Sequence, residues 1–427
     1  MQRFFMSVNI IRAAQRVDSS YAGRLKISVT SSIGLIPIQD ATVRISYKGI
    51  PDSVIETLDT DNSGQTEEIE LAAPPLEYSL TPGSDQPYSE YNIEVNAPGY
   101  EPVTVSGTEI LAGTLALQPI EMNPLEMEQQ PQETIVIPDH TLYGEYPPKI
   151  PEDEIKPMDE SGEIVLSRVV IPEFVIVHDG VPSDFTAPNY YVRYKDYIKN
   201  VASSEIYATW PESAIYANIL TIMSVTLNRV YTEWYRNQGY NFTITSSTAY
   251  DQKWMYGRNI YENIDYLVDT VFANFLSRPG VRQPIFTSYC DGQRVTCSGL
   301  SQWGSKYLGD EGYSAIEIIR YYYGNDMYIN TAESISGVPS SWPGYDLTIG
   351  SSGDKVRQMQ QQLNRIAQNY PAIPMTTADG VFGSRTAEAV RIFQRIFNLP
   401  QTGVVDYPTW YQISNIYVGV SRIAEPV

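Results

Sequence analysis

Two glutamates on either side of a Trp-Pro pair are the residues best suited to acid–base chemistry. Glu205 precedes Ile206 and lies close to Trp210, so an apolar environment would raise the pKa of its carboxyl group. A carboxyl group kept protonated in this way can act as a general acid. Glu212 follows Pro211 in a predicted first helical turn, where the helix dipole favours an acidic residue. From the residues alone, Glu205 is either such an acid or an ordinary solvated helix glutamate, and Glu212 is interpreted as structural.

Histidine and cysteine are too few for most other catalytic chemistries. The two histidines, His140 and His178, cannot build a multi-histidine metal site, and neither lies near a nucleophile motif. Cys290 and Cys297 could form a disulfide, remain thiols or bind a metal. Because no histidine lies near them in the sequence, we expect no metal site and no cofactor.

Charge and composition narrow the range of partners. With 50 acidic and 29 basic residues the formal net charge is −21, which disfavours phosphate backbones and anionic membranes. No stretch reaches the roughly 18 apolar residues that a membrane span needs. The 33 tyrosines offer flat rings and hydroxyls that suit sugars, although tyrosine also fills strands and helix seams. Neither nucleic acid nor a membrane is expected as a partner.

Local patterns divide the chain into three folded parts and two linkers. Apolar and polar residues alternate between turn signals in the N-terminal part, which predicts β-strands. Residues 1–16 are interpreted as a first strand, because no small-residue cleavage site follows them. The predicted parts are, in order, a β-sandwich (1–120), an acidic proline-rich linker (121–172), a mainly α, α+β domain (173–335), a short linker (336–346) and a helical tail (347–427).

The element that follows most clearly from periodicity lies in the central part. A helix is predicted from Glu262 to the break at Pro279, because apolar residues from Ile264 to Leu276 share one face. A second helix is predicted to start at Pro211. The linker before this part combines proline with like charges, so it is expected to be extended and open to proteases.

The tail carries the most specific pattern of the sequence. It resembles the three-helix peptidoglycan-binding module, and the resemblance covers essentially the whole tail. Most matching residues determine the fold, so a ligand groove is implied by the resemblance alone. The matching residues are Gly353, Val356, Met359, Gln360, Leu363, Asp379, Gly380, Phe382, Gly383, Thr386, Ala389, Val390, Phe393, Gln394, Gly403, Thr409 and Trp410.

Three segments of the central part resemble the SpoIID/LytB family. They are YIKNVASSEIYATWPESAIYANILTIMSVTLNR, AYDQKWMYGR and FTSYCDGQRVTCSGLSQWGSKYLG, followed by the tyrosine run before Gly324. Tyr216, Asn218 and Asp291 depart from the residues usual in this family. The N-terminal part also resembles small β-sandwich repeats related to carboxypeptidase regulatory domains, through DTDNSGQT and VNAPGYEP.

The SpoIID/LytB resemblance implies a lytic transglycosylase that cuts peptidoglycan glycan strands, with Glu205 as its acid and base. It further implies that Tyr256, Ser301 and Gln302 bind substrate through hydrogen bonds and that Trp303 offers a stacking face. A purely structural interpretation of the turn around Ser301 is that its glycines only shape the chain. The protein as a whole could instead be a non-catalytic activator of another hydrolase or an N-acetylmuramoyl-L-alanine amidase.

The order of the parts resembles that of clostridial spore cortex-lytic proenzymes. This resemblance implies storage in the spore, spore cortex peptidoglycan as substrate, and activation by a subtilisin-like Csp protease at germination. The cut is expected within residues 123–170, with residues 126–134 preferred. The competing interpretation is a passive spacer and an anchoring N-terminal domain.

Overall fold

The computed structural model describes residues 21–83, 85–125, 133–156, 168–332, 334–336 and 342–421. The first strand predicted in residues 1–16 lies outside these ranges, as does most of the preferred cleavage region. Among the helices of the described ranges, none is both long and apolar enough to cross a membrane.

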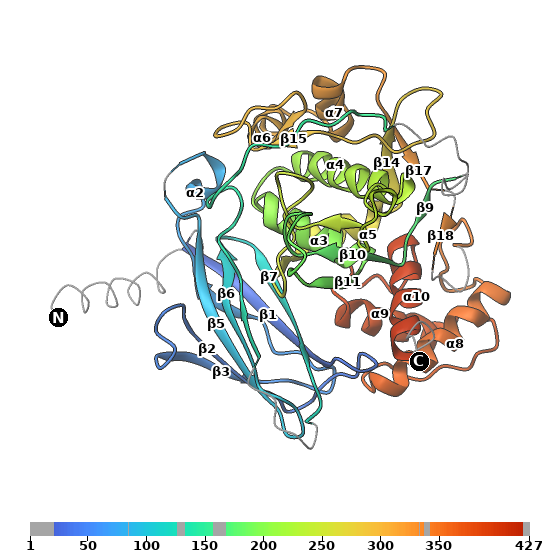
Figure 1. Ribbon diagram of the computed structural model, residues 1–427. Coiled ribbons are helices and arrows are strands. Elements are labelled where there is room, and N and C mark those ends of the chain that lie inside the picture. Colours follow the sequence, from blue (N-terminus) through green and yellow to red (C-terminus); the bar gives the residue numbers. More distant parts are fainter. Residues whose placement is uncertain are drawn as a thin grey trace.

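The N-terminal part is built from two β-sheets that pack against each other (Figure 1). On β1 the side chains of Leu25, Ile27 and Val29 are fully buried, and the residues between them are not. This period of two is typical of a strand with one buried face and confirms the predicted β-structure. The first sheet has the order β13 (Ile260–Tyr261), β7 (Leu115–Met122), β1 (Ala22–Ser31) and β4 (Ile69–Ala72), and the second β3 (Val54–Asp59), β2 (Thr42–Tyr47), β5 (Tyr88–Asn96), β6 (Val103–Leu111) and β8 (Glu133–Val136).

Two strands of these sheets come from outside the predicted sandwich. β8 pairs in parallel with β6, although the sequence places it in the predicted linker. β13 pairs antiparallel with β7, although it belongs to the predicted central domain. The edges of the sheets therefore do not coincide with the predicted boundary at residue 120, because pairing between distant segments leaves no local pattern.

Residues 137–156, which we call the covering segment, also differ from the extended linker that was predicted. Ile137 and His140 are fully buried. The backbone N–H of Ile150 donates to the carbonyl of Ala249 at 2.8 Å. The segment has no helix or strand of its own, as its prolines predicted, but contacts with the central part hold it in place.

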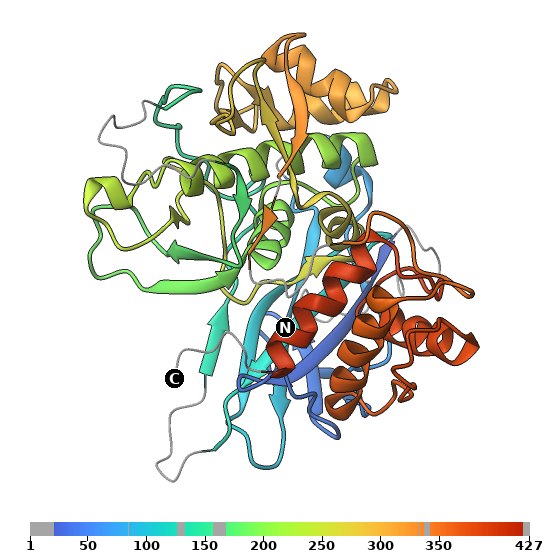
Figure 2. The ribbon, with the colours of Figure 1, turned by 90° about the vertical axis from the view of Figure 1, so that its right-hand side faces the viewer.

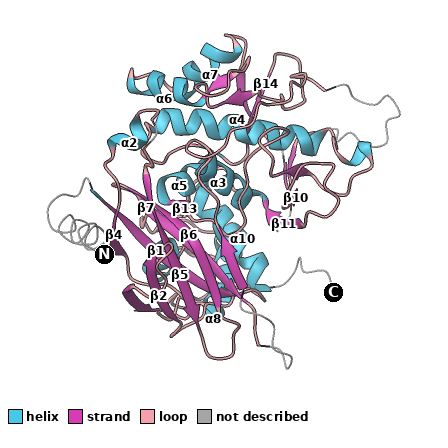
Figure 3. Cartoon of the chain, turned by 60° about the vertical axis from the view of Figure 1, so that its left-hand side comes forward, coloured by secondary structure: helices cyan, strands magenta, loops and turns pink. Residues whose placement is uncertain are grey.

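The central part is mainly helical, with short strands between the helices (Figure 3). α4 is buried on almost every side, which is typical of a core helix, and Pro211 caps its start as predicted. The helices are α3 (Tyr194–Glu205), α4 (Glu212–Tyr231), α5 (Glu262–Val271), α6 (Gln302–Asp310) and α7 (Ala315–Tyr323). The short strands that matter below are β15 (Tyr289–Cys290) and β16 (Leu300–Ser301).

The helix predicted from Glu262 to the break at Pro279 is shorter in the structure. α5 ends at Val271, and β14 (Asn274–Ser277) follows and pairs antiparallel with β17 (Tyr328–Thr331). Leu276 is fully buried in β14. A buried leucine at this position fits the apolar pattern of a strand as well as that of a helix. The apolar run fits both periods, and the distant partner strand decides between them.

The tail folds as three helices, α8 (Asp354–Asn369), α9 (Ser384–Ile396) and α10 (Tyr407–Ser421), as predicted. Gln360 and Gln394 explain part of its pattern. The side-chain oxygen of Gln360 accepts the N–H of Gly380 at 2.9 Å, and that of Gln394 accepts the N–H of Gly403 at 2.8 Å. Both glycines have positive φ. Each glutamine therefore holds a tight turn that needs glycine.

The tail contacts both other parts of the molecule (Figure 2). The hydroxyl of Tyr370 donates to the carbonyl of Leu35 in the sandwich at 3.1 Å. From the central part, Lys195 reaches Gln412 on α10 at 2.8 Å. Phe272 lies edge-on to Tyr411, with 5.3 Å between the ring centroids. Each of the three parts thus contacts the other two.

Candidate active site

Glu205 is the last residue of α3, and its side chain is fully buried. Its Oε1 accepts the backbone N–H of Lys253 at 2.6 Å, and its Oε2 accepts Nε2 of Gln302 at 3.4 Å. The buried hydroxyl of Tyr289 lies near the carboxylate. Of the residues predicted for the site, the structure thus brings Gln302 to Glu205.

Burial raises the pKa of the Glu205 carboxyl, as its apolar sequence neighbours predicted. The nearby cation of Lys149 and the Tyr289 hydroxyl act in the opposite direction, but burial is the larger effect and the pKa stays above its ordinary value. A raised pKa favours the protonated form that a general acid needs.

The covering segment closes the site. Lys149 extends its Nζ over the ring of Tyr289, 4.1 Å from the centroid, and donates to the carbonyl of Asp251 at 2.8 Å. Tyr146 is buried beside Glu205, and the negative charge of Glu205 adds to the burial that raises the pKa of Tyr146. Because the Glu205 carboxyl is fully buried, a large ligand cannot reach it in this arrangement.

Ion pairs fasten the covering segment to the central helices. Arg229 on α4 binds both carboxylate oxygens of Glu152, at 2.6 and 2.9 Å, and also Asp251 at 2.6 Å. Arg278 makes a second two-pronged contact with Glu154, at 2.6 and 2.9 Å. Bidentate arginine–carboxylate pairs fix geometry as well as charge. A pocket of about 520 Å³ remains between this segment and residues 179–181 and 246–253.

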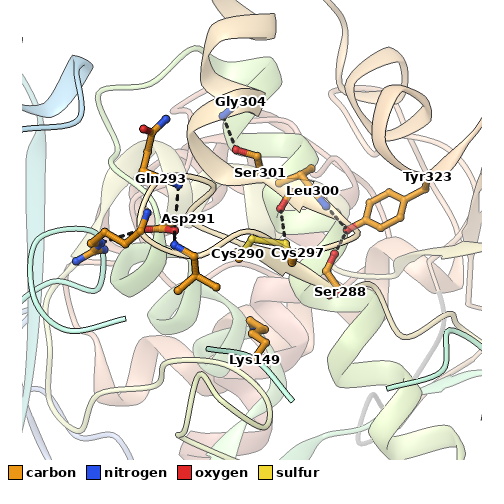
Figure 4. Close-up of a disulfide and its surroundings, with 12 residues drawn as sticks. Lys149, Ser288, Cys290, Asp291, Gln293, Cys297, Leu300, Ser301, Gly304 and Tyr323 are labelled. Atoms are coloured by element: carbon orange, nitrogen blue, oxygen red, sulfur yellow. Dashed lines mark hydrogen bonds and ion pairs between the residues drawn. A yellow bond between two sulfur atoms is a disulfide. The ribbon is translucent and has the colours of Figure 1, made fainter. Parts of the chain in front are cut away.

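Figure 4 shows the disulfide loop and, below it, Lys149 of the covering segment. Cys290 and Cys297 are paired, which decides among the three states left open by the sequence. Asp291, where the family usually has glycine, is buried and accepts the N–H of Val295 at 2.9 Å. Arg294 of the loop donates to the carbonyls of Gly144, and of Thr141 at 2.8 Å, in the covering segment. The described residues contain no group of three or more metal-ligating side chains.

The other predicted binding residues lie in different surroundings. Ser301 caps α6 through the N–H of Gly304 at 2.9 Å. Trp303 is 3% exposed and packs on Trp210, with 4.9 Å between the rings, so it belongs to the core and offers no free stacking face. The reason is that the turn directs Trp303 into the helices rather than toward Glu205.

Tyr256 lies on the surface and is 39% exposed. Its hydroxyl donates to Glu133 of β8 at 3.1 Å, and its ring stacks on Tyr190 at 4.7 Å. The structure therefore does not join Tyr256 to Glu205 directly.

The remaining departures from the family pattern have structural roles. Asn218 ties α4 to α6 through Ser305 Oγ at 2.8 Å. The Tyr216 hydroxyl accepts from Asn274 at 3.4 Å. Tyr289 and Lys149 are the residues of the site that the sequence did not reveal. For Tyr289, the available signal in the sequence was its position next to Cys290 in the FTSYC motif.

Comparison with known proteins identifies the tail. Residues 352–413 match the family described as a peptidoglycan binding domain. The C-terminal part of the chain is therefore a peptidoglycan-binding domain, and the match supports binding to peptidoglycan. The matched residues do not include Glu205.

Solved structures resemble only small portions of the chain, and no curated protein sequence matches it. The Bacillus anthracis TIE protein is 16% identical over 25% of this chain and 17% of its own, with a TM-score of 0.18. The minor pilin GBS52 of Streptococcus agalactiae is 14% identical over 26% and 48%, with a TM-score of 0.18. The chain thus spans less than half of either structure, and such similarity carries no argument about function.

Proposed function

We propose that the chain is a lytic transglycosylase of spore cortex peptidoglycan, of the SpoIID/LytB kind and made as a proenzyme of the SleC type. The observation that carries the proposal is the buried Glu205, which accepts hydrogen bonds from the N–H of Lys253 and from Gln302 and is covered by a segment of the same chain. The peptidoglycan-binding domain supplies the substrate class.

The reaction needs one carboxyl group in two roles. Glu205 first protonates the oxygen that leaves between MurNAc and GlcNAc. As a carboxylate it then removes the proton of the muramic acid C6 hydroxyl, whose oxygen attacks the anomeric carbon and closes a 1,6-anhydro ring. Because no water is consumed, a second carboxylate is not required, in contrast to ordinary glycosidases.

Activation then consists of uncovering Glu205. Residues 133–156 are paired or packed, and a protease needs extended backbone that fits its cleft. Within the predicted span of residues 123–170, residues 133–156 are therefore poorly suited to cleavage, and we keep the part of the preferred region that precedes residue 133 for the Csp protease. Such a cut breaks the covalent connection between most of the sandwich and the covering segment. The sandwich, which pairs with β8 through β6, must then separate before the segment can move away from Glu205.

Mass spectrometry of cortex digested by the intact and the protease-cut chain tests the proposal. The expected products of the cut chain are glycan fragments with 1,6-anhydro-muramic ends. Muramic acid lacking its peptide would instead indicate the amidase. Absence of any product, with stimulation of a separate hydrolase, would indicate the activator.

A further inference from the structure

The turn that follows β1, which we call the Leu35 turn (residues 32–36), holds a leucine in a backbone conformation that leucine rarely adopts. Leu35 has a φ of +47°, and Gly34 before it has a φ of +74°. The N–H of Ser31 donates to the carbonyl of Ile36 at 2.8 Å and closes the turn. A residue with a β-carbon is strained in this left-handed region, so glycine would suit the position better. Such an outlier indicates a role for the leucine side chain outside the turn.

The side chain of Leu35 packs against α10 of the tail, at a glycine. A β-carbon added to Gly419 would lie 2.4 Å from Cδ1 of Leu35, closer than two carbon atoms approach. Gly419 is buried in α10, where glycine destabilises a helix relative to alanine. It also lies beyond residues 352–413, which match the peptidoglycan-binding family. The recess at Gly419 is therefore outside the part shared with that family, and it fits Leu35.

Two hydrogen bonds from the end of α8 hold the same turn. The hydroxyl of Tyr370 donates to the carbonyl of Leu35 at 3.1 Å. The side-chain amide of Asn369 donates to the carbonyl of Gly34 at 3.4 Å. The tail thus binds both the backbone of the Leu35 turn and its one strained side chain.

The end of α9 adds two contacts with the strands beside this turn. The side-chain amide of Gln65 donates to the carbonyl of Ile396, the last residue of α9. The Nζ of Lys26 on β1 donates to the side-chain oxygen of Asn398 at 3.4 Å. All three helices of the tail therefore contribute to one face, and this face meets the sandwich (Figure 2).

We propose that the tail has a second binding site, for the Leu35 turn, and that through it the tail retains the sandwich after the chain is cut. The sandwich residues of this interface lie between Lys26 and Gln65, before the preferred cut in residues 126–132, and the tail lies after it. A cut there leaves the two sides of the interface on different fragments. The inference goes beyond the proposed function and rests on it only for the position of the cut.

Leu35→Gly and Asp40→Gly form a matched pair of variants. Both replace a sandwich residue of positive φ by glycine, which adopts such a backbone without strain. Asp40 has a φ of +57° and is exposed, and its backbone N–H pairs with Thr60 inside the sandwich. Each chain carries the recognition site of a sequence-specific protease in place of residues 126–132. After cleavage, the anisotropy of a dye on the N-terminal amine follows the rate at which the two fragments dissociate.

The Leu35→Gly fragments should dissociate roughly tenfold faster than those of the parent, because the interface loses a partly buried leucine side chain. Asp40→Gly should leave the rate unchanged. On the tail, Tyr370→Phe should speed dissociation roughly threefold to tenfold, since the Leu35 carbonyl loses this donor. Its control is Tyr411→Phe, which removes a hydroxyl that accepts the N–H of Trp342 at 3.3 Å within the tail, and which should have no effect.

Dissociation of the Leu35→Gly fragments at the parent rate, or an equal acceleration by Asp40→Gly, would overturn the inference. Because the measurement follows the fragments and not the digestion of cortex, the two proposals fail separately. If Glu205→Gln digests cortex at the parent rate while Leu35→Gly still speeds dissociation, the transglycosylase is refuted and the retention of the sandwich by the tail stands.

Discussion

Glu205 is surrounded by groups that move the pKa of its carboxyl in opposite directions. Burial raises it, whereas Lys149 and the Tyr289 hydroxyl lower it. Lys149 belongs to the covering segment, so its charge favours the carboxylate while the site is closed. When the segment leaves, the cation that lowers the pKa and part of the burial that raises it are lost together, so the two effects on the pKa oppose each other.

Replacement of Lys149 by Met should therefore raise the pH at which Glu205 takes up a proton. The sign follows because a neighbouring cation stabilises the carboxylate, and its removal keeps the carboxyl protonated to higher pH. Infrared titration of the full chain measures the midpoint. Lys48→Met, which removes a lysine paired with Glu90 in the sandwich, is the control and should cause no shift. Equal midpoints for Lys149→Met and the parent would contradict this account.

The sequence analysis proposed Glu205 and Gln302 because both stand in short motifs with local chemical meaning, and the structure places the two side chains in contact. Lys149 carries no such motif, since its importance depends on where a distant segment folds. The prediction that Trp303 offers a free stacking face was wrong, because it relied on a local pattern where tertiary packing decides. An aromatic residue in a glycine-bounded turn suggests a sugar platform, but only tertiary packing tells a platform from a core ring.

At the scale of elements, the covering segment is the feature on which the closed state depends. It has little secondary structure, so its stability comes from side chains such as Glu152 and Glu154, which bind arginines of the central part. Proline and acid content predicted its lack of regular structure correctly. The same content could not reveal the arginines, because they lie far away in the sequence.

Glu152→Gln should loosen the covering segment while leaving Arg229 paired with Asp251. Loss of a charge-assisted contact of this kind costs about 1.5–3 kcal/mol. Trypsin should then cut after Lys149 faster than in the parent, and the uncut chain should gain some cortex-digesting activity. The exposed Glu145 lies in the same segment, so Glu145→Gln is the control. Identical cleavage rates in both variants would show that the Glu152 contact does not hold the segment.

At the scale of the whole molecule, the sandwich is joined to the rest by more than the chain itself. β8 lies beyond the preferred cut yet pairs with β6, and β13 pairs with β7. Between these strands, Arg258 of the central part forms a buried ion pair with Glu109 at 2.7 Å. Cleavage within residues 126–132 would leave all of these contacts in place.

The two fragments of the cut chain should therefore stay together and separate more readily at higher pH. Burial raises the pKa of Glu109 to about 7 from its ordinary 4.5, so the complex holds a proton that the separated fragment loses between these values. Association should weaken as pH rises from about 5 to 7 and be weakest above 7. Size-exclusion chromatography of the cut chain across this range measures it. Glu109→Gln should lose the pH dependence, and fragments that part at pH 5 would refute the prediction.

The tail has its own core and should bind the wall alone. Residues 342–427, which include Trp342 packed on Trp410, should fold and sediment with purified sacculi. Gln394→Leu leaves the N–H of Gly403 unpaired and should destabilise the fold by about 1–3 kcal/mol in chemical denaturation. A tail that folds but does not sediment would contradict the prediction. The fold of the tail could be predicted from the sequence because its turns and core follow one local pattern.

The central claim is that Glu205 cuts the glycan strand, and product analysis of Glu205→Gln tests it most directly. Glutamine is nearly the same size, so the protease-cut variant should keep the fold of the parent and sediment equally with sacculi. Mass spectrometry of cortex incubated with each should find 1,6-anhydro-muramic ends from the parent and none from the variant. Anhydro ends formed by Glu205→Gln at the parent rate would show that another group performs the reaction.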